Sequence, residues 1–398
     1  MDDHFLNVVS LNIPYPPNYG GIIDIYYKLK ALKRLGVRLI LHCFEYERPE
    51  APELEEICEK VYYYKRHTGL LANMSLLPYN VVSRKEPKLM ERLLENNYPI
   101  LFEGLHCCYY MADPRLKGRK KIYRECNIEH DYYRYLAQST RHLIRTLFYR
   151  IEAWRFFRYQ TVVRHADLVV AVSRADQAYL RTQFPDKPIE FIPCFHENNE
   201  IRCREGASEF ILYHGKLSVE ENEKAALFLI REVFRKLPYT CVIAGMNPSK
   251  KLIRVAAPYP NIRVEANPDK HRMEELIREA QINTLITFQD TGLKLKLLNS
   301  LFAGRHILVN PLMLAGSGLE PYCARVSDLT DKESVVEPLC LIANTPTEMI
   351  QACKRLMRCP FSKQAIQVRK NALFPTYSNQ AQGERLFNLI FGGEHITV

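Results

Sequence analysis

Short apolar runs alternate with amphipathic stretches along the first half of the chain. Residues 6–13 are rich in valine, leucine and isoleucine, which predicts a buried strand. A loop with prolines and two glycines follows, and residues 22–35 then repeat apolar side chains at helical spacing up to Gly36. Residues 37–44 are predicted as the next strand. The order strand, glycine loop, helix, strand is the opening of a doubly wound α/β domain.

The rest of the first half continues this alternation. A helix is predicted at 87–96, and further strands are predicted at 61–64, 100–103, 121–125, 168–172 and 189–193. Glu129 and His130 come shortly after the strand at 121–125, at its carboxyl end. Ligands of open α/β sheets bind at that edge, so both residues are candidates for a functional site.

A second series of elements begins after the polar segment 197–208, which we interpret as a linker. Strands are predicted at 210–213, 240–244, 262–265, 283–288 and 306–310, a last strand can be placed at 338–342, and helices are predicted at 220–237, 272–280, 347–356 and 380–391. Two consecutive α/β series predict two doubly wound domains that face each other across a cleft at their strand ends. We place these domains at 1–200 and 206–377, and the last helix, 378–398, can pack back on the first.

The second series is organised around residues 289–310, which indicate a strand end, a glycine turn, a helix and another strand. Gly292 permits a tight turn that a ligand can approach, and Gly304 suits a helix end in the left-handed region. The apolar helical positions are Leu293, Leu297, Leu298 and Leu301. A helix N-terminus after a glycine turn attracts anions, and Lys294 adds positive charge there. Phosphate is therefore the expected ligand, whereas Lys296 points to another side of the helix and is interpreted as a surface lysine.

Length, cysteine content and net charge limit the classes of protein to which this chain can belong. The 398 residues suffice for two domains, and the twelve cysteines are scattered without any Cys-x-x-Cys pair, which predicts reduced thiols and a cytoplasmic protein. The N-terminus lacks the features of a signal peptide, and no apolar run approaches the length of a membrane span. The net charge of +10 is compatible with nucleic acid, an anionic membrane surface or an anionic substrate. No nucleic-acid-binding motif is present, and neither a dinucleotide fingerprint nor a Walker loop occurs.

Residues 132–165 are predicted as one long helix rich in arginine and aromatic residues. Two interpretations remain open for it. The helix can pack its aromatic side chains inward and expose its arginines, or it can lie against an anionic membrane as a peripheral contact.

Several motifs, taken in order, resemble the retaining glycosyltransferases of the GT-B fold, family four (glycosyltransferase group 1). The resembling segments are Pro16-x-x-x-Gly20-Gly21, Ala166 to Ser173, Phe191-Ile192-Pro193, Tyr213 to Leu217, Val242 to Gly245, and Thr291 to Gly304. The resemblance covers nearly the whole chain. It implies an acceptor-side N-terminal domain, a nucleotide-sugar-binding C-terminal domain, and a UDP- or GDP-linked sugar as substrate with no separate cofactor.

The resemblance also assigns roles to individual residues. It implies donor contacts from Gly20, Gly21, Gly215, Lys216, Gly292, Lys294 and Asn299, and catalytic or sugar-contacting roles for His130 and Glu129. The family commonly carries two glutamates eight positions apart on the donor helix, where this chain has Thr291 and Asn299, and an arginine where it has Lys216. Asn299 can still bond a ribose hydroxyl and Lys216 can still neutralise phosphate. No Asp-x-Asp occurs, so the resemblance implies a metal-independent reaction in which the departing phosphate takes the acceptor's proton.

Three hypotheses from different classes follow. The first is a glycosyltransferase that moves a sugar to a glycan or lipid-linked acceptor, in surface polysaccharide synthesis. The second is a non-catalytic nucleotide-sugar or glycan-binding protein on the same fold, which the uncharged Asn299 favours. The third is a nucleotide-sugar epimerase, which needs an acid and base pair of carboxylates that the sequence does not show.

Overall fold

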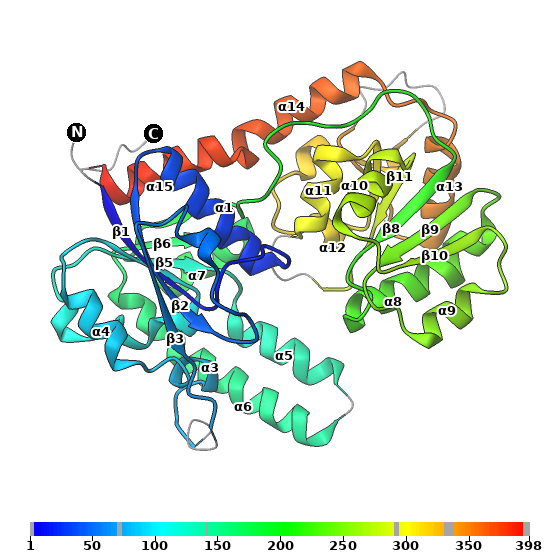
Figure 1. Cartoon of the computed structure of the whole chain (residues 1–398). Helices are drawn as coiled ribbons and strands as arrows, with labels where there is room; N and C mark the ends of the chain where they lie inside the picture. Colours follow the sequence, from blue (N-terminus) through cyan, green and yellow to red (C-terminus); the bar gives the residue numbers. More distant parts are fainter. Residues whose placement is uncertain (1–3, 70–73, 141, 290–293, 330–337, 393–398) are drawn as a thin grey trace. The chain divides into compact units, whose positions relative to one another are not determined.

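The computed structural model describes residues 4–69, 74–140, 142–289, 294–329 and 338–392 (Figure 1). The described residues divide into two compact units. Unit 1 holds the chain up to Glu197 and the segment from Tyr377 onward, and unit 2 holds the described residues from Asn198 to Thr376. The cleft expected between the two domains stays a prediction.

Unit 1 is built on a seven-stranded sheet with the order β3-β2-β1-β4-β5-β6-β7. All neighbouring strands are parallel, and Val8 of the central β1 lies opposite Leu41 on one side and Leu101 on the other. The strands are β1 Phe5–Ser10, β2 Arg38–Glu45, β3 Lys60–Lys65, β4 Ile100–Glu103, β5 Lys121–Glu125, β6 Leu168–Ala171 and β7 Ile189–Phe191. The chain order reverses between β1 and β4, which is the position where such sheets bind ligands.

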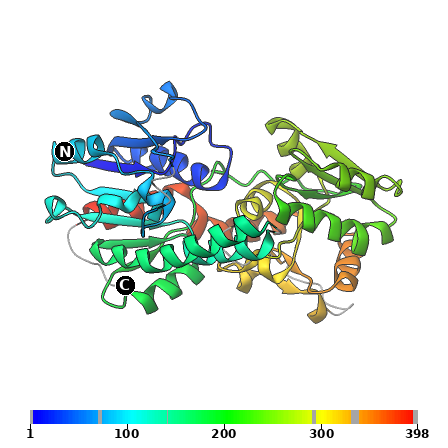
Figure 2. The ribbon, with the colours of Figure 1, turned by 90° about the horizontal axis from the view of Figure 1, so that it is seen from below.

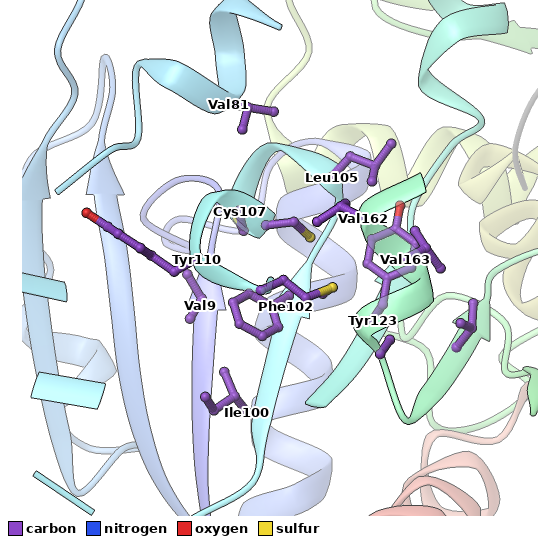
Figure 3. Close-up of a cluster of buried hydrophobic side chains, with 14 of the residues drawn as sticks. Val9, Val81, Ile100, Phe102, Leu105, Cys107, Tyr110, Tyr123, Val162 and Val163 are labelled. Atoms are coloured by element: carbon purple, nitrogen blue, oxygen red, sulfur yellow. The ribbon is translucent and has the colours of Figure 1, made fainter. Parts of the chain in front are cut away.

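Helices cover both faces of this sheet, which explains why its strands are apolar runs with little polar alternation. They are α1 Gly20–Arg34, α3 Tyr79–Val82, α4 Pro87–Leu94, α5 Glu129–Ser139, α6 Leu143–Tyr159, α7 Arg174–Gln183 and α15 Asn379–Phe391. One buried cluster, shown in Figure 3, joins Val9 of β1, Phe102 of β4 and Tyr123 of β5 to side chains of the covering segments. The C-terminal α15 packs on α1, where a Cβ on Gly383 would lie 3.2 Å from Ala31 Cβ.

The prediction of a single helix at 132–165 is wrong. The chain forms two helices, α5 and α6, which lie side by side (Figure 1), and a short 3-10 helix, Gln160–His165, follows them. Thr140 has an extended backbone (φ −85°, ψ 140°) and ends α5. The chain then turns back, so that the rings of Tyr133 and Phe156 stack with their centres 5.1 Å apart. The chain therefore forms two helices in place of one, and aromatic rings are buried between them.

Unit 2 repeats the architecture with a second parallel seven-stranded sheet, in the order β10-β9-β8-β11-β12-β14-β13. Its strands are β8 Phe210–His214, β9 Thr240–Gly245, β10 Ile262–Ala266, β11 Ile282–Leu285, β12 His306–Val309, β13 Ala324–Arg325 and β14 Leu341–Ile342. The order reverses between β8 and β11. The two parallel sheets confirm the doubly wound α/β class predicted from the alternation of elements.

The helices of unit 2 are α8 Glu220–Phe228, α9 Lys250–Ala256, α10 Lys270–Glu279, α11 Leu295–Ala303, α12 Pro311–Leu314, α13 Pro346–Leu356 and α14 Lys363–Tyr377. The sequence pattern gave no range for five of the helices, which are α3 and α7 of unit 1 and α9, α12 and α14 of unit 2. The helix predicted at 220–237 is one continuous segment, in which α8 passes into a π turn, Leu229–Val233, and a 3-10 turn, Phe234–Lys236. The missed helices are short or rich in charged residues, so their apolar periodicity is weak.

Two local expectations in unit 2 need correction. The strand predicted at 283–288 ends at Leu285, because the Thr287 amide donates to Asn310 Oδ1 (3.1 Å) and Asn310 Nδ2 donates to Thr287 O (2.7 Å). Gly304 ends α11 in an extended conformation (φ −85°, ψ 168°), not a left-handed one. Glycine is required there by a close approach, since a Cβ would lie 2.3 Å from Asn283 Nδ2.

Candidate functional site

The carboxyl edge of the unit 2 sheet, between β8 and β11, carries three of the residues predicted to contact the donor. Gly215 and Lys216 follow β8, and Lys294 precedes α11, whose position after β11 is visible in Figure 1. Gly292, the predicted turn residue, lies outside the described residues. Leu297, Leu298 and Leu301 are buried on one face of α11 as predicted, and Leu293, the fourth predicted position, lies outside the described residues.

The turn after β8 is held tightly by its neighbours. The Gly215 amide donates to Ala244 O (3.2 Å), and Asn222 Nδ2 donates to Lys216 O (3.1 Å). A Cβ on Gly245 would lie only 1.8 Å from Gly215 O, so this approach of two turns requires glycine. The backbone of Gly215 and Lys216 is therefore fixed, while the Lys216 side chain is exposed.

Two lysines at the start of α11 have different surroundings. Lys294 is the N-cap residue, so it adds positive charge at the end where the helix dipole is already positive. Lys296 lies inward, with Nζ 3.1 Å from Asn222 Oδ1 and 5.5 Å from the centre of the Tyr213 ring. Burial lowers the pKa of Lys296 to about 8, although the Glu221 carboxylate opposes this effect. The interpretation of Lys296 as a surface lysine is wrong, because its side of α11 faces α8 and β8.

Sequence reasoning missed the groups around Lys296. Thr287 is fully buried and its hydroxyl donates to Glu221 of α8. The available signal was the three glutamates in the first turn of α8. His214 at the end of β8 lies 3.0 Å from Ser300 Oγ, and burial, assisted by the Lys296 charge, lowers the pKa of His214 to about 3. This edge thus presents cations that suit an anion, beside a carboxylate that can accept hydrogen bonds from hydroxyl groups.

Asn299, predicted to bond a ribose hydroxyl, already has a partner within unit 2. Its Oδ1 accepts a hydrogen bond of 2.8 Å from Asn198 Nδ2, and Asn198 is 2% exposed. The side chain therefore ties α11 to the segment that follows the first unit. A ribose contact from Asn299 stays a prediction.

In unit 1, Gly20 and Gly21 are the first two residues of α1. The prediction that placed them in the preceding loop is wrong. The N-cap is Tyr19, with an extended backbone (φ −150°, ψ 160°). A Cβ added to Gly21 would meet no atom within 4 Å. The folded protein itself thus has room for a side chain at this position. A donor contact at Gly20 and Gly21 stays a prediction.

Four buried charges hold α1 to the sheet just below this N-terminus. Lys28 Nζ lies 2.9 Å from both Asp24 Oδ2 and Glu103 Oε2, and the side chains are at most 3% exposed. Arg124 of β5 donates to Asp24 Oδ1 (3.1 Å) and to Pro193 O (3.0 Å). Burial alone would raise the pKa of Asp24, but Arg124 and Lys28 outweigh it and lower that pKa to about 2. The network therefore carries ionised groups in the interior and links α1, β4 and β5.

Glu129 is the first residue of α5 and is buried at the carboxyl edge of the unit 1 sheet. Its Oε2 lies 3.7 Å from His106 Nε2. Burial raises the pKa of Glu129 to about 8, with the Arg84 charge opposing the shift. A carboxyl group that titrates close to neutral pH can give or take a proton under physiological conditions, which is the property of a general acid or base.

His130 is adjacent in sequence but points elsewhere. Its ring lies 5.3 Å from the Phe157 ring and 5.7 Å from the Tyr179 ring, centre to centre, and the Tyr179 hydroxyl lies 3.5 Å from Nε2. Burial lowers the pKa of His130. The surroundings are those of a packed histidine between α5, α6 and α7. Glu129 and His130 do not form a pair, and a sugar contact by His130 stays a prediction.

We expect Glu129→Gln to stabilise the protein at alkaline pH. Between about pH 5 and pH 8 the folded chain keeps a proton on Glu129 that the unfolded chain has lost, so stability falls as the pH rises through this window. Glutamine removes this loss, and the expected gain in the free energy of unfolding is ~1–3 kcal/mol at about pH 8. Urea unfolding at several pH values measures it, with Glu91→Gln on the exposed side of α4 as control. Equal pH dependence in wild type and Glu129→Gln would contradict the prediction.

Comparison with known proteins adds two matches in sequence. Residues 24–197, within unit 1, match the family model Glycosyltransferase Family 4. A Klebsiella pneumoniae protein, named an uncharacterized 44.6 kDa protein in the cps region, is 32% identical over 159 residues. That alignment covers 37% of the chain and 40% of the relative, so it spans about two fifths of the relative's length.

Solved structures match over nearly the whole chain at low identity. TarM from S. aureus superposes with a TM-score of 0.66 at 9% identity, covering 98% of this chain and 99% of that one. Alr3699/HepE from Anabaena, in complex with UDP and glucose, gives 0.61 at 10% identity, covering 97% and 99%. An α,α-trehalose-phosphate synthase (UDP-forming) from Burkholderia vietnamiensis gives 0.57 at 10% identity, covering 96% and 98%. At identities this low, the superpositions establish the fold alone, and that fold is GT-B.

The family model matches residues within unit 1, and the solved structures establish the GT-B fold for nearly the whole chain. Within the described ranges, none of the helices is both long and apolar enough to cross a bilayer. Among the same residues, no three side chains of histidine, cysteine, aspartate or glutamate are placed to hold one metal ion.

Proposed function

We propose that this chain is a retaining, metal-independent glycosyltransferase that moves a sugar from a nucleotide-sugar donor to a glycan or lipid-linked acceptor. The observation that carries the proposal is the cationic end of α11 at the β8/β11 edge, where Lys294 caps the helix and the Gly215 turn is fixed beside it. This edge suits a diphosphate, since amides, a helix dipole and lysines all favour negative charge. The similar structures solved in complex with UDP and glucose and with UDP-glucose support a nucleotide sugar as the ligand.

The chemistry requires little covalent work from the protein. The bond between the anomeric carbon and the diphosphate breaks, and the acceptor hydroxyl oxygen bonds to that carbon on the same face of the sugar. The hydroxyl proton passes to the departing phosphate oxygen. Charge builds up on the diphosphate as it leaves, and Lys294, with Lys216 nearby, stabilises that charge more in the transition state than in the ground state.

The acceptor side of the proposal rests on unit 1. Glu129 is a buried carboxyl that titrates near neutral pH at the carboxyl edge of the sheet, where it can bond an acceptor hydroxyl. The cps region in the name of the Klebsiella relative supports a role in surface polysaccharide synthesis. A cytoplasmic enzyme, peripheral on the inner face of the membrane, fits this role, and its twelve cysteines, all of which are described, are free thiols.

The test is a thermal-shift panel with UDP, GDP and their common sugar conjugates without added metal, followed by turnover assays with the nucleotide that binds. A ligand that binds only the folded state raises the melting temperature. Stabilisation with turnover supports the enzyme. Stabilisation without turnover with any acceptor extract favours a non-catalytic nucleotide-sugar-binding protein. No shift with any nucleotide would overturn both the transferase and that binding protein.

Gly21→Ala sharpens this test. The alanine Cβ enters open space at the start of α1, so the variant is expected to be as stable as wild type or more stable by up to ~1 kcal/mol. If the donor approaches this backbone, the same methyl group lowers kcat/KM by about tenfold or more. Gly69→Ala is the matched control, because a Cβ there also meets no atom within 4 Å. Unchanged kcat/KM in Gly21→Ala would remove Gly21 from the donor site.

A further inference from the structure

The outer face of α6 exposes an unusual number of large apolar side chains. Leu143 is 85% exposed, Ile144 79% and Leu147 61%, and Trp154 near the other end of the helix is 48% exposed. Phe148, Ile151 and Phe157 are also exposed. We call the exposed apolar residues of α6, from Leu143 to Phe157, the α6 face. Monomeric proteins seldom present a contiguous apolar surface of this kind without a binding role.

Helical geometry shows that the α6 face is a second apolar side of the helix. Leu143, Leu147, Ile151 and Trp154 follow one another at spacings of three and four, so they form one stripe. The opposite side carries Ala153 and Phe156, which are buried in the unit 1 core against α5. A surface helix normally has one apolar and one polar side. The fold of unit 1 therefore accounts for the inner side of α6 and leaves the α6 face without a structural reason.

The charges around the α6 face are positive. Arg145, Arg150 and Arg158 of α6 are exposed, and the Arg158 guanidinium lies 5.1 Å from the centre of the Trp154 ring. The one carboxylate of α6, Glu152, is buried and accepts hydrogen bonds from the Tyr79 amide (2.9 Å) and Arg155 (2.7 Å). The exposed side of this helix thus combines apolar and aromatic side chains with arginine and presents no carboxylate.

The apolar surface continues beyond α6. The hydrogen bond from the Tyr79 amide to Glu152 holds the preceding segment against the helix. Leu76, 81% exposed, lies in that segment and lines a depression together with Arg155 and Arg158. Two stretches that are far apart in sequence therefore contribute to one exposed surface of unit 1.

We propose that the α6 face, with Leu76 beside it, docks on an anionic lipid bilayer. Leucine, isoleucine and tryptophan insert at the level of the headgroups while arginines bind lipid phosphates, which is the arrangement of interfacial helices. The charge distribution decides between occupants. A two-fold contact with a second copy would bring like-charged arginines together, whereas an anionic surface complements them. The inference deepens the proposed function, because it assigns the surface and the lipid class of the peripheral contact, whereas docking itself needs neither donor nor acceptor.

The experiment uses the full chain and vesicles of phosphatidylcholine with phosphatidylglycerol, or of phosphatidylcholine alone. Trp154 is the only tryptophan of the chain, so its fluorescence reports on the α6 face without labels. We expect the protein to sediment with the anionic vesicles, more weakly at high salt, and the Trp154 emission to shift to the blue and to be quenched by brominated lipid. Binding to neutral vesicles is expected to be at least about tenfold weaker.

Two double variants separate the contribution of the apolar side chains to membrane binding from that of the arginines. Ile144→Gln with Leu147→Gln is expected to weaken binding to anionic vesicles at least about tenfold, because two inserted side chains become polar. Arg145→Gln with Arg150→Gln is expected to weaken it by about tenfold and to reduce its salt dependence. All four side chains are exposed, so the fold should tolerate the changes. Controls on unit 2 are Ile253→Gln, 47% exposed on α9, and Arg231→Gln with Arg235→Gln, which should bind as wild type.

Three results would overturn the proposal. They are no binding to either kind of vesicle, equal binding by wild type and the α6 variants, or a stable oligomer that the Ile144→Gln, Leu147→Gln variant converts to monomers. The last result would make the α6 face a contact between protein chains. Because the vesicles contain neither nucleotide sugar nor glycan, none of these results bears on the transfer reaction, and absence of turnover does not bear on docking.

Discussion

Replacement of Arg124 by methionine is expected to lower the free energy of unfolding of unit 1 by ~3–5 kcal/mol, because one partner is removed from a buried ionic network. The change leaves Asp24 and Glu103 with Lys28 alone in the interior. It also removes the donors that satisfy the carbonyl oxygens of Ile192 and Pro193. Methionine has a similar length, so the effect reports lost charge and hydrogen bonds more than a cavity.

Urea unfolding followed by Trp154 fluorescence measures this prediction, since the single tryptophan lies in unit 1. Arg115→Met is the matched control. Arg115 also pairs with an aspartate, Asp113, at 2.8 Å, but its side chain is 57% exposed, and little change in stability is expected. A loss for Arg124→Met no larger than that of the control would show that the buried network contributes little.

The same buried ionic network predicts that the stability of the fold falls in acid. Asp24 has a folded pKa of about 2, below its ordinary value of 3.8, so its ionised form stabilises the fold above that ordinary value. This contribution is lost as the pH falls toward 2. In Arg124→Met the largest charge that lowers the pKa is gone, so the loss should begin at a higher pH.

Lys294→Ala is expected to reduce kcat by about a hundredfold to a thousandfold, which is the usual effect of removing one group that stabilises developing charge. Lys294 is half-buried at the N-terminus of α11 and makes no side-chain cap hydrogen bond, so the melting temperature without ligand should change by only a few degrees, roughly. Release of nucleoside diphosphate from the donor that the thermal-shift panel identifies measures the rate. The thermal shift produced by that nucleotide should shrink in parallel.

The control for Lys294 is a second lysine at the start of a helix in the same unit. Lys250 is the first residue of α9, and Lys250→Ala should leave both kcat and the nucleotide shift unchanged. Lys216→Ala, on the exposed turn after β8, should show an intermediate loss, since a flexible surface lysine provides only a point charge. Equal activity of Lys294→Ala and Lys250→Ala would remove the α11 end from the reaction.

The sequence by itself determined the architecture of this protein. Strands such as β1 and β8 are short apolar runs because helices cover both faces of a parallel sheet, and this burial leaves a local mark in the amino acids. The spacing of leucines on α11 likewise follows from one buried face. The order of these local signals was enough to predict two doubly wound domains and the sheet edges where the candidate residues lie.

Only the tertiary structure decided which side chains meet. Asp24 and Arg124 are a hundred positions apart, so no spacing rule could reveal their pairing. Glu129 and His130 are neighbours in sequence, yet helix geometry sends one toward His106 and the other toward Phe157. The split of residues 132–165 into α5 and α6 depends on aromatic packing between the two helices. Only the folded structure shows that the outer side of α6 is apolar. Secondary structure follows from local burial patterns, whereas the chemistry of a site depends on side-chain directions that only packing sets.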